Sequence, residues 1–203
     1  MAKEPVPGQV KTRLCPPCSP AEAAALAEAA LADTLEAVAG CGADRRILAL
    51  AGRTGPWLPA GFAVIKQRGR DFAARLDHAW AATGGPGFQI GMDTPQLDAH
   101  HLDAALEVLA GGATAVIGRA IDGGWWGIGF QSPPVGVFED VAMSSPHTAD
   151  QQVARCRALG IGEVAELVEL RDVDTWTDAL AVAGDAPATR FAAAVRSLSA
   201  DTP

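Results

Sequence analysis

Apolar and polar positions follow different periods in successive segments of the chain. Longer segments with apolar positions at helical spacing predict helices, and short apolar runs predict strands. The longest helix starts at a capping box, in which Ser19 is the cap, Pro20 takes the first helical position and Glu22 reaches back to the cap. We expect strands at residues 47–51, 88–92, 115–118, 125–130 and 164–170, and helices at 21–39, 72–82, 98–109 and 147–159, with two more from 175 and from 187.

This order of strands and helices indicates the fold class. Parallel strands need long connections, usually helices, so strands that alternate with helices favour a mostly parallel sheet covered on both faces. No internal repeat or long linker divides the sequence. We therefore expect one three-layer α/β/α domain over residues 1–203, in which 187–203 form a terminal helix and a tail.

Composition and charge exclude several classes of protein. The 203 residues include 24 acidic and 16 basic side chains, a net charge of −8, and 49% hydrophobic residues. This is too apolar for a disordered chain, and no apolar run reaches the roughly 18 residues of a membrane span. A net charge of −8 disfavours nucleic acid and anionic membranes as partners. Four cysteines without a repeating spacing, and no visible signal peptide, favour a reduced cytoplasmic protein.

The first fourteen residues differ from the rest because they carry a net charge of +2. Two prolines stiffen this segment, and Gly8 permits close approach of the backbone to a ligand. Lys3 and Lys11 are two of only three lysines in the chain. Lys11 supplies a point charge and Arg13 a planar fork, a combination that suits a polyphosphate. A flexible, solvated basic terminus is the alternative interpretation.

Aspartates directly follow two of the predicted strands, at the sheet edge where α/β proteins bind ligands. Asp93 follows the strand at 88–92, and Asp172 and Asp174 follow the strand at 164–170. Carboxylates in such positions are suitable ligands for Mg²⁺ held between protein and phosphates. A turn role for Asp93 and a helix-cap role for Asp174 are the alternatives.

Two further segments have an open interpretation. Asp122-Gly123-Gly124 comes before a pair of tryptophans, where paired glycines favour either a backbone that lies against a planar or sugar-like ligand or a turn into a core strand. The basic residues of 66–75 open a helix, whose N–H groups favour anions. A solvated helix start is the alternative for that segment.

Taken together, these segments resemble a family of bacterial transferases with the nucleotide-diphospho-sugar transferase (GT-A) fold, of the selenodomain-associated or arsenosugar-associated glycosyltransferase type. The resemblance covers residues 2 to about 181, with the motifs in the family's order. The matched motifs are AKxPxPGxVKTRL at 2–14, QxGxDLGxRL at 67–76, DSPxL at 93–97, DGGYY at 122–126, WST at 143–145 and DVDTxxDL at 172–180. The opening and the ending are also distantly similar to those of phospholactate guanylyltransferases.

The resemblance implies a nucleotide site that contains Mg²⁺ or Mn²⁺. The residues expected to act in catalysis are Lys11, Arg13, Asp93 and Asp122. The residues expected near the metal ion are Asp93, Asp172 and Asp174. The residues expected to bind the nucleotide are Lys3, Gly8, Lys11, Thr12, Arg13, Gln67, Gly69, Arg75, Gly123 and Gly124. Within this last set, the resemblance implies that Lys11, Thr12 and Arg13 contact the phosphates and that Gln67, Gly69 and Arg75 lie near the nucleoside.

The sequence departs from the family pattern in four places. Family chains have an apolar strand before the first motif, and Met1 stands where that strand would end. We therefore expect either that the start codon is misplaced or that the N-terminal strand is missing. Its loss would expose neighbouring strand edges and loosen the phosphate site. Phe72 and Ala73 replace Leu-Gly, and Trp125 and Trp126 replace two tyrosines. Met143-Ser144-Ser145 replaces Trp-Ser-Thr. These changes affect acceptor specificity more than nucleotide binding.

The leading hypothesis is a Mg²⁺-dependent transferase with a nucleotide-activated donor and a small-molecule acceptor. We favour nucleotidyl transfer, because the loop with Lys11 and Arg13 suits a nucleoside triphosphate better than a sugar diphosphate. Glycosyl transfer from a nucleotide sugar is the first alternative. A nucleotide-binding protein that lost its activity with the missing strand is the second. The oligomeric state stays open, with a homodimer as one option.

Overall fold

The structure, a computed structural model, describes residues 1–200. Strands and helices alternate along the chain, as the hydrophobic pattern predicts. The strands are β1 (Ala2–Lys3), β2 (Arg46–Ala51), β3 (Phe62–Lys66), β4 (Gly87–Ile90), β5 (Ala115–Arg119), β6 (Trp125–Phe130) and β7 (Val164–Glu166). The helices are the 3-10 helix η1 (Thr12–Leu14) and the α-helices α1 (Pro20–Gly40), α2 (Phe72–Thr83), α3 (Ala99–Ala110), α4 (Thr148–Ala158), α5 (Trp176–Asp185) and α6 (Arg190–Ala200).

Local sequence signals set the helix boundaries. The capping box expected at the start of α1 is present: the Ser19 hydroxyl accepts a hydrogen bond from the Glu22 amide, and the Glu22 carboxylate accepts one from the Ser19 amide. Asp98 caps α3 and Thr175 caps α5 through their side chains. Because Thr175 fills the cap position, Asp174 is available for contacts elsewhere.

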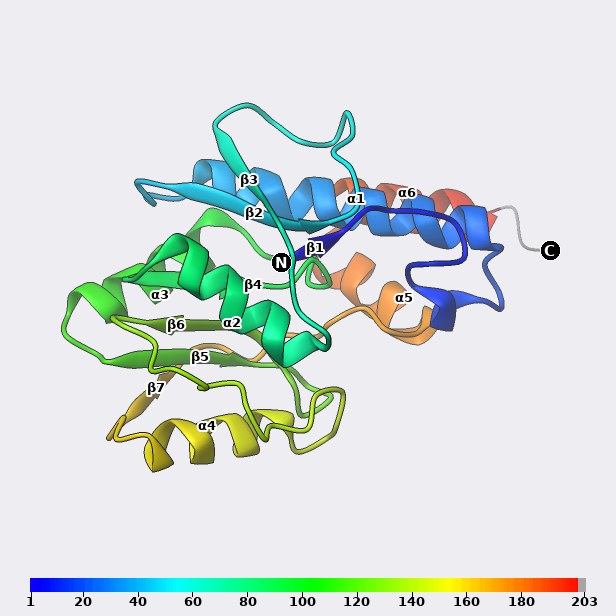
Figure 1. The fold of residues 1–203 in the computed structure, drawn as a ribbon. Helices are drawn as coiled ribbons and strands as arrows, with labels where there is room; N and C mark the ends of the chain where they lie inside the picture. Colours follow the sequence, from blue (N-terminus) through cyan, green and yellow to red (C-terminus); the bar gives the residue numbers. More distant parts are fainter. Residues whose placement is uncertain (201–203) are drawn as a thin grey trace.

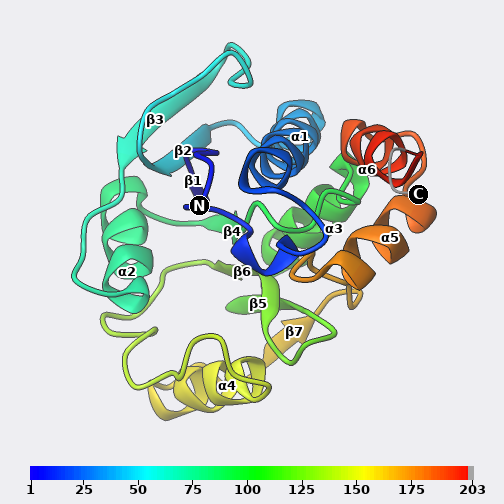
Figure 2. The ribbon, with the colours of Figure 1, turned by 90° about the vertical axis from the view of Figure 1, so that its right-hand side faces the viewer.

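The strands form two sheets. The first has the order β1-β2-β3 and is parallel, and the second has the order β4-β6-β5-β7, in which β6 runs antiparallel to both neighbours and β5 is parallel to β7. A short turn joins β5 to β6, too short for a crossover, so these two strands must be antiparallel. Figure 2 shows all the strands in one row, with β1 beside β4.

Helices cover both faces of this row of strands (Figures 1 and 2). On one face lie α2 and α4, and on the other lie α1, α3 and α5, with α6 packed against α1 and α5. The three-layer α/β/α architecture expected from the sequence is confirmed. Within residues 1–200, no helix is both long and apolar enough to cross a membrane.

β1 is a short strand directly after the position at which the family's N-terminal strand would end. The two residues of β1 pair in parallel with the last two residues of β2. On the other side, the Met1 amine donates a hydrogen bond to the carbonyl oxygen of Ile90 in β4, at 2.8 Å. A strand this short has no hydrophobic period of its own, so the pattern does not predict it. The pairing partners on both sides define it instead.

Two other strands differ from the prediction. The hydrophobic pattern does not predict β3, an edge strand whose side chains are all exposed or half-buried. The strand expected at 164–170 ends at Glu166. Beyond that point the amides of Leu167 and Leu170 still donate to the β5 carbonyls of Ile117 and Arg119, but regular pairing stops. The last helix begins at 190, not at 187.

Candidate functional site

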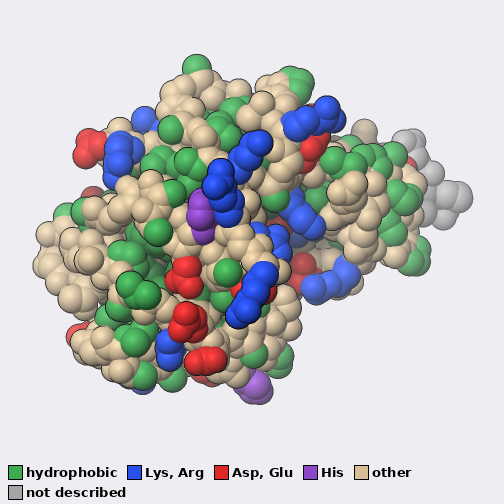
Figure 3. All heavy atoms as spheres, in the orientation of Figure 1, with side chains coloured by type: hydrophobic (Ala, Val, Ile, Leu, Met, Phe, Trp, Pro, Cys, Tyr) green, Lys and Arg blue, Asp and Glu red, His purple; other side chains and the backbone are tan. Residues whose placement is uncertain are grey.

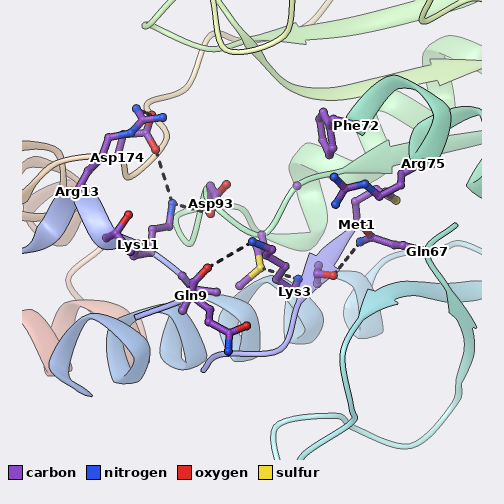
Figure 4. Close-up of a pocket in the computed structure, with 15 residues that line it drawn as sticks. Met1, Lys3, Gln9, Lys11, Arg13, Gln67, Phe72, Arg75, Asp93 and Asp174 are labelled. Atoms are coloured by element: carbon purple, nitrogen blue, oxygen red, sulfur yellow. Dashed lines mark hydrogen bonds and ion pairs between the residues drawn. The ribbon is translucent and has the colours of Figure 1, made fainter. Parts of the chain in front are cut away.

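The loops that follow β1, β3 and β4 meet the segment after β7 around a cavity of about 390 Å³, here called the pocket. Figure 4 shows Lys11, Arg13, Asp93 and Asp174 at one end of the pocket, and Gln67 and Arg75 at the other. The predicted site residues that line the pocket are Lys3, Lys11, Thr12, Arg13, Gln67, Arg75, Asp93 and Asp174. The pocket lies at the carboxyl ends of the strands, where ligands bind in α/β folds.

Two buried side chains anchor the N-terminal loop. Val10 and Leu14 are buried in clusters that include residues of α1, and Leu14 is fully enclosed. Between them, Lys11 has a left-handed backbone conformation with φ of 47°, and its carbonyl oxygen accepts a hydrogen bond from the Leu14 amide. Such a conformation is uncommon for a lysine and needs support from its surroundings. The anchored loop thus brings the side chains of Lys11 and Arg13 to the pocket.

The Lys11 ammonium joins two segments that lie far apart in the sequence. Its side chain is only 10% exposed, and Nζ lies 2.6 Å from Oδ1 of Asp93 and 4.0 Å from Oδ1 of Asp174. Nζ also donates a hydrogen bond to the carbonyl oxygen of Val173. The backbone oxygen of Asp93 accepts from the Val173 amide at 2.8 Å. The end of β4 and the segment at 172–174 are therefore held together around one lysine.

Asp174 connects the basic loop to a group of carboxylates. Nη1 of Arg13 lies 2.7 Å from Oδ2 of Asp174. Asp122, Asp172 and Asp174, here called the aspartate trio, each offer an oxygen within 4.8 Å of the others. Burial first, and the nearby charge of Asp122 second, raise the pKa of Asp172 to about 6. Hard carboxylate oxygens that repel one another fit a divalent cation such as Mg²⁺ or Mn²⁺.

The structure groups the predicted aspartates differently from the sequence interpretation. Asp93, expected near the metal ion and in catalysis, forms an ion pair with Lys11, and Asp122, expected in catalysis, belongs to the aspartate trio. Asp122 lies in the turn between β5 and β6, and an isolated bridge between Ala120 and Leu170 brings this turn beside the segment at 172–174. No local sequence motif predicts that bridge, because it depends on the register of distant strands.

The predicted glycines serve the protein's own packing at two positions. A Cβ on Gly123, where φ is +89°, would lie 2.0 Å from the carbonyl oxygen of Pro146, and a Cβ on Gly69 would lie 2.7 Å from backbone atoms of α2. The amide of Gly124 donates to Oδ1 of Asp122 at 2.7 Å, which fixes that carboxylate. Gly8 differs, since its φ is +74° and no atom lies within 4 Å of its Cβ position. Gly8, Gly69, Gly123 and Gly124 do not line the pocket.

The far end of the pocket combines polar and aromatic groups. Nε2 of Gln67 donates to the backbone oxygens of Ala2, at 2.8 Å, and of Ala49, at 3.0 Å, and so fastens β1 to β2. Nε of Arg75 donates to the Asp71 carbonyl oxygen at 3.2 Å. Phe72 also lines the pocket, with 43% of its surface exposed, and sequence reasoning missed it. Its only sequence signal is an apolar residue directly after the helix cap of α2.

Basic and acidic side chains also lie in separate regions of the protein surface. Basic side chains gather across the middle of the face that carries the N-terminus, and acidic side chains lie below them (Figure 3). The chain as a whole has a net charge of −8. A local positive region on an acidic protein can hold a small anion without attracting a polyanion.

The layers, the strand order and a charged pocket at the strand ends define the nucleotide-diphospho-sugar transferase (GT-A) fold class. A "putative nucleotide-diphospho-sugar transferase" from Desulfovibrio desulfuricans G20 matches the chain with a TM-score of 0.85 at 26% sequence identity, covering 98% of this chain and 92% of that chain. The chain belongs to the DUF2064 family, described as uncharacterized proteins conserved in bacteria, whose model matches residues 22–145.

More distant similarity is found to Rv0371c from Mycobacterium tuberculosis H37Rv. That structure gives a TM-score of 0.47 at 21% identity, covering 89% of this chain and 94% of that chain. A structure of the same protein in complex with manganese gives a TM-score of 0.46 at 22% identity, covering 89% and 95%. Comparison with curated proteins gives no match.

Proposed function

We propose that the protein is a divalent-cation-dependent transferase that binds a nucleotide-activated donor in the pocket. One observation carries this proposal: Asp174 contacts Arg13 and Lys11 on one side and belongs to the aspartate trio on the other. A metal ion and the phosphates it neutralises need adjacent acidic and basic groups of this kind. The structural similarity to the protein from Desulfovibrio desulfuricans G20 supports a transferase.

The favoured reaction is nucleotidyl transfer. An acceptor oxygen would form a bond to the α-phosphorus of a nucleoside triphosphate while the bond from that phosphorus to the bridging oxygen breaks. The products are the nucleotidyl acceptor and pyrophosphate, and the proton of a hydroxyl acceptor passes to solvent. Lys11 and Arg13 lie on one short loop and match the charge that collects on the leaving pyrophosphate.

Each charged residue has a role in this proposal. Lys11 exchanges Asp93 for a phosphate oxygen, and the backbone oxygen of Val173 keeps the ammonium in place. Arg13, whose side chain is 65% exposed, turns from Asp174 to the phosphates. The aspartate trio would hold Mg²⁺ or Mn²⁺, which supplies Lewis-acid neutralisation of phosphate charge when bound.

Glycosyl transfer from a nucleotide sugar is the second candidate. The structural similarity to the nucleotide-diphospho-sugar transferase from Desulfovibrio desulfuricans G20 favours it. The same pocket would then bind a diphosphate, and a sugar, not a nucleotidyl group, would move to the acceptor. The two candidates differ in their leaving group, which is pyrophosphate in one and a nucleoside diphosphate in the other.

Calorimetry with nucleoside triphosphates and nucleotide sugars, each with Mg²⁺ or Mn²⁺, tests the binding step. We expect saturable binding that disappears with EDTA. Phosphorus NMR of turnover mixtures then identifies pyrophosphate or nucleoside diphosphate as the product. If no triphosphate or nucleotide sugar binds in the presence of either metal ion, both candidates are wrong.

The metal site has its own matched test. Asp174→Asn removes one carboxylate of the trio, and Asp185→Asn makes the same change at the end of α5, away from the pocket. We expect Asp174→Asn to weaken Mn²⁺ binding at least about tenfold, and Asp185→Asn to leave it unchanged. Electron paramagnetic resonance of free Mn²⁺ measures both, and equal affinities in the two variants would contradict the assignment.

A further inference from the structure

Two free cysteines lie close together in the chain, directly after the loop that reaches the pocket. Cys15 follows η1 and is half-buried, and Cys18 precedes the cap of α1 and is buried. The segment just before them carries Lys11 and Arg13 to the pocket (Figure 4). Two prolines separate the cysteines, which gives the CxxC spacing found in many dithiols that form disulfides. The proposed transferase reaction uses neither of them.

The backbone holds the two cysteines on one closed turn. The Cys18 amide donates a hydrogen bond to the carbonyl oxygen of Leu14 at 2.9 Å, which closes a turn of five residues. The Cys15 amide donates to the carbonyl oxygen of Thr12 at 3.2 Å, so the residues before Cys15 also form a tight turn. A closed turn brings residues three positions apart within reach of the roughly 4.4–6.8 Å between Cα atoms that a disulfide spans. The backbone therefore suits a bond between the two sulfurs.

The two side chains also point in the same direction. Cys18 is a buried member of the apolar cluster that contains Leu14 of η1 and Leu26 of α1, and Cys15 packs against this same cluster. Burial first, then the charge of Glu22 and then that of Cys15, raise the pKa of the Cys18 thiol. The two thiols thus lie near enough for a charge on one to affect the other.

The other two cysteines differ from this pair. Sγ of Cys41 donates to the carbonyl oxygen of Val38 at 3.3 Å, and Sγ of Cys156 accepts from Nε2 of Gln152 at 3.8 Å. Within residues 1–200, the thiols of the pair make no such hydrogen bond, and the pair belongs to no group of three or more ligands that could hold a metal ion. A zinc site needs about four ligands. The chemistry that remains open to the pair is that of two neighbouring thiols.

We propose that Cys15 and Cys18 are a redox-active dithiol, which a small disulfide of the glutathione class oxidises to an intramolecular disulfide. Because Cys15 is the more accessible of the two, its sulfur forms a bond to one sulfur of the small disulfide, and the other half leaves as a thiolate. The sulfur of Cys18 then forms a bond to Sγ of Cys15, and the second half leaves. The two cysteines lose two electrons, their protons pass to the two leaving thiolates, and the small disulfide ends as two thiols.

The new bond would fasten the turn that joins the pocket loop to α1. In the reduced protein, the hydrogen bond from the Cys18 amide to Leu14 and the apolar cluster hold this turn. A covalent bond across the turn restricts its opening, because the two ends can no longer separate. The modification acts on the turn itself and stands apart from the transferase activity.

Equilibration of the folded protein with mixtures of reduced and oxidised glutathione tests the proposal. Alkylation followed by mass spectrometry counts the free thiols, of which the reduced chain has four. We expect the count to fall from four to two in one step, and peptide mapping to place the disulfide at Cys15 and Cys18. Four free thiols at every ratio of the two glutathione forms would overturn the proposal, and so would a disulfide at any other pair.

Two single substitutions serve as controls for the thiol count. Cys18→Ser removes the thiol that attacks second, so we expect this variant to stop at a mixed disulfide between Cys15 and glutathione. Cys41→Ser removes a thiol outside the pair, and we expect it still to lose two thiols in one step. A mixed disulfide that accumulates equally in Cys18→Ser and in the unmodified protein would contradict the proposal.

Hydrogen exchange measures the effect on the turn. We expect exchange at the Cys18 amide to slow by at least about tenfold on oxidation of the unmodified protein, with no change at the Ile117 amide in β5. In Cys15→Ser, which keeps Cys18 but cannot form the disulfide, we expect equal exchange at Cys18 with and without oxidised glutathione. Equal exchange at Cys18 before and after oxidation of the unmodified protein would show that the bond does not fasten the turn, and would overturn this part of the proposal.

Discussion

The pocket and a second cavity of about 720 Å³ between β2 and β4, here called the groove, are both lined by Met1, and they differ in almost every other respect. In the pocket, charged side chains from distant segments pair with one another, as Lys11 does with Asp93 and Arg13 with Asp174. In the groove, apolar side chains lie beside the edge of β4 and the edge of β2 at residues 46–49, and neither edge pairs with another strand within residues 1–200. The pocket therefore matches a charged ligand of small size.

This difference explains how the protein remains folded around each cavity without a ligand. The ion pairs of the pocket satisfy its charges internally, so ligand binding exchanges one set of partners for another at modest cost. Unpaired backbone groups have no such substitute apart from water, and an apolar surface beside them is unfavourable in water. We therefore expect substitutions in the pocket to change function more than stability, and substitutions in the groove to do the reverse.

The largest effect is expected from Lys11→Met. This change removes the ammonium that lies 2.6 Å from Asp93 but keeps most of the side-chain volume. Loss of a charge aimed at the phosphates should lower kcat/KM by about 10²–10³-fold. Steady-state kinetics on the donor identified by calorimetry measures it, together with Tm from thermal unfolding.

Lys66→Met is the matched control for Lys11→Met. Lys66 is the exposed last residue of β3 and does not line the pocket. It should keep kcat/KM within about twofold of the unmodified protein. If Lys11→Met lowers Tm strongly and leaves kcat/KM unchanged, the pocket is a structural ion-pair site and the comparison with the groove fails.

The sequence predicts most of the fold because caps and periods are local signals. Ser19, Asp98 and Thr175 each cap the expected helix, and the alternation of elements leads to the three layers. The sequence does not predict β1, since its two residues owe their conformation to β2 and β4. It also does not predict β3, whose exposed positions at the sheet edge do not mark a buried strand.

The candidate site is predictable to a similar extent. The basic N-terminal segment indicates Lys11, and aspartates after predicted strands indicate Asp93 and Asp174; all three line the pocket. The pairing of Lys11 with Asp93 and the grouping of Asp122 with Asp172 are not predictable, because they depend on strand register and on the bridge at Ala120. Long-range pairing of this kind leaves no periodic trace in one sequence.

The second prediction is a gain in stability. Without metal ions, we expect Asp172→Asn to raise the free energy of unfolding, a smaller effect than that of Lys11→Met on kcat/KM. The pKa of Asp172 is raised from its ordinary value to about 6, so ionisation of this group opposes folding. The unmodified protein should lose stability as pH rises from about 4 to about 6, and the variant should lose less. At pH 8 we expect Asp172→Asn to be more stable by about 1–2 kcal/mol, a value reduced for partial solvent exposure. Urea unfolding at pH 4 and pH 8 with EDTA measures the difference.

Mn²⁺ provides the control for Asp172→Asn. Saturating Mn²⁺ should stabilise the unmodified protein at pH 8 through binding to the folded state, and should not stabilise the variant. Asp185→Asn, outside the aspartate trio, should follow the unmodified protein in both conditions. A variant that is less stable than the unmodified protein at pH 8 would show that Asp172 has a favourable partner, and the trio would then not be a cation site.

The smallest change in stability is expected in the groove, from Gln89→Leu. Nε2 of Gln89 is buried without a partner, and a buried polar group in that state costs about 1–3 kcal/mol. Replacing it with an apolar group of similar size should raise stability by about 1 kcal/mol, or Tm by about 2–4 °C. Gln9→Leu makes the same change at an exposed residue that lines the pocket, and should leave Tm unchanged.

Calorimetry should give the same nucleotide affinity for Gln89→Leu as for the unmodified protein, because Gln89 contacts the groove and not the pocket. A weaker nucleotide affinity in Gln89→Leu would mean that the two cavities are coupled through β1. The strand edges would then help to position the loop that carries Lys11 and Arg13.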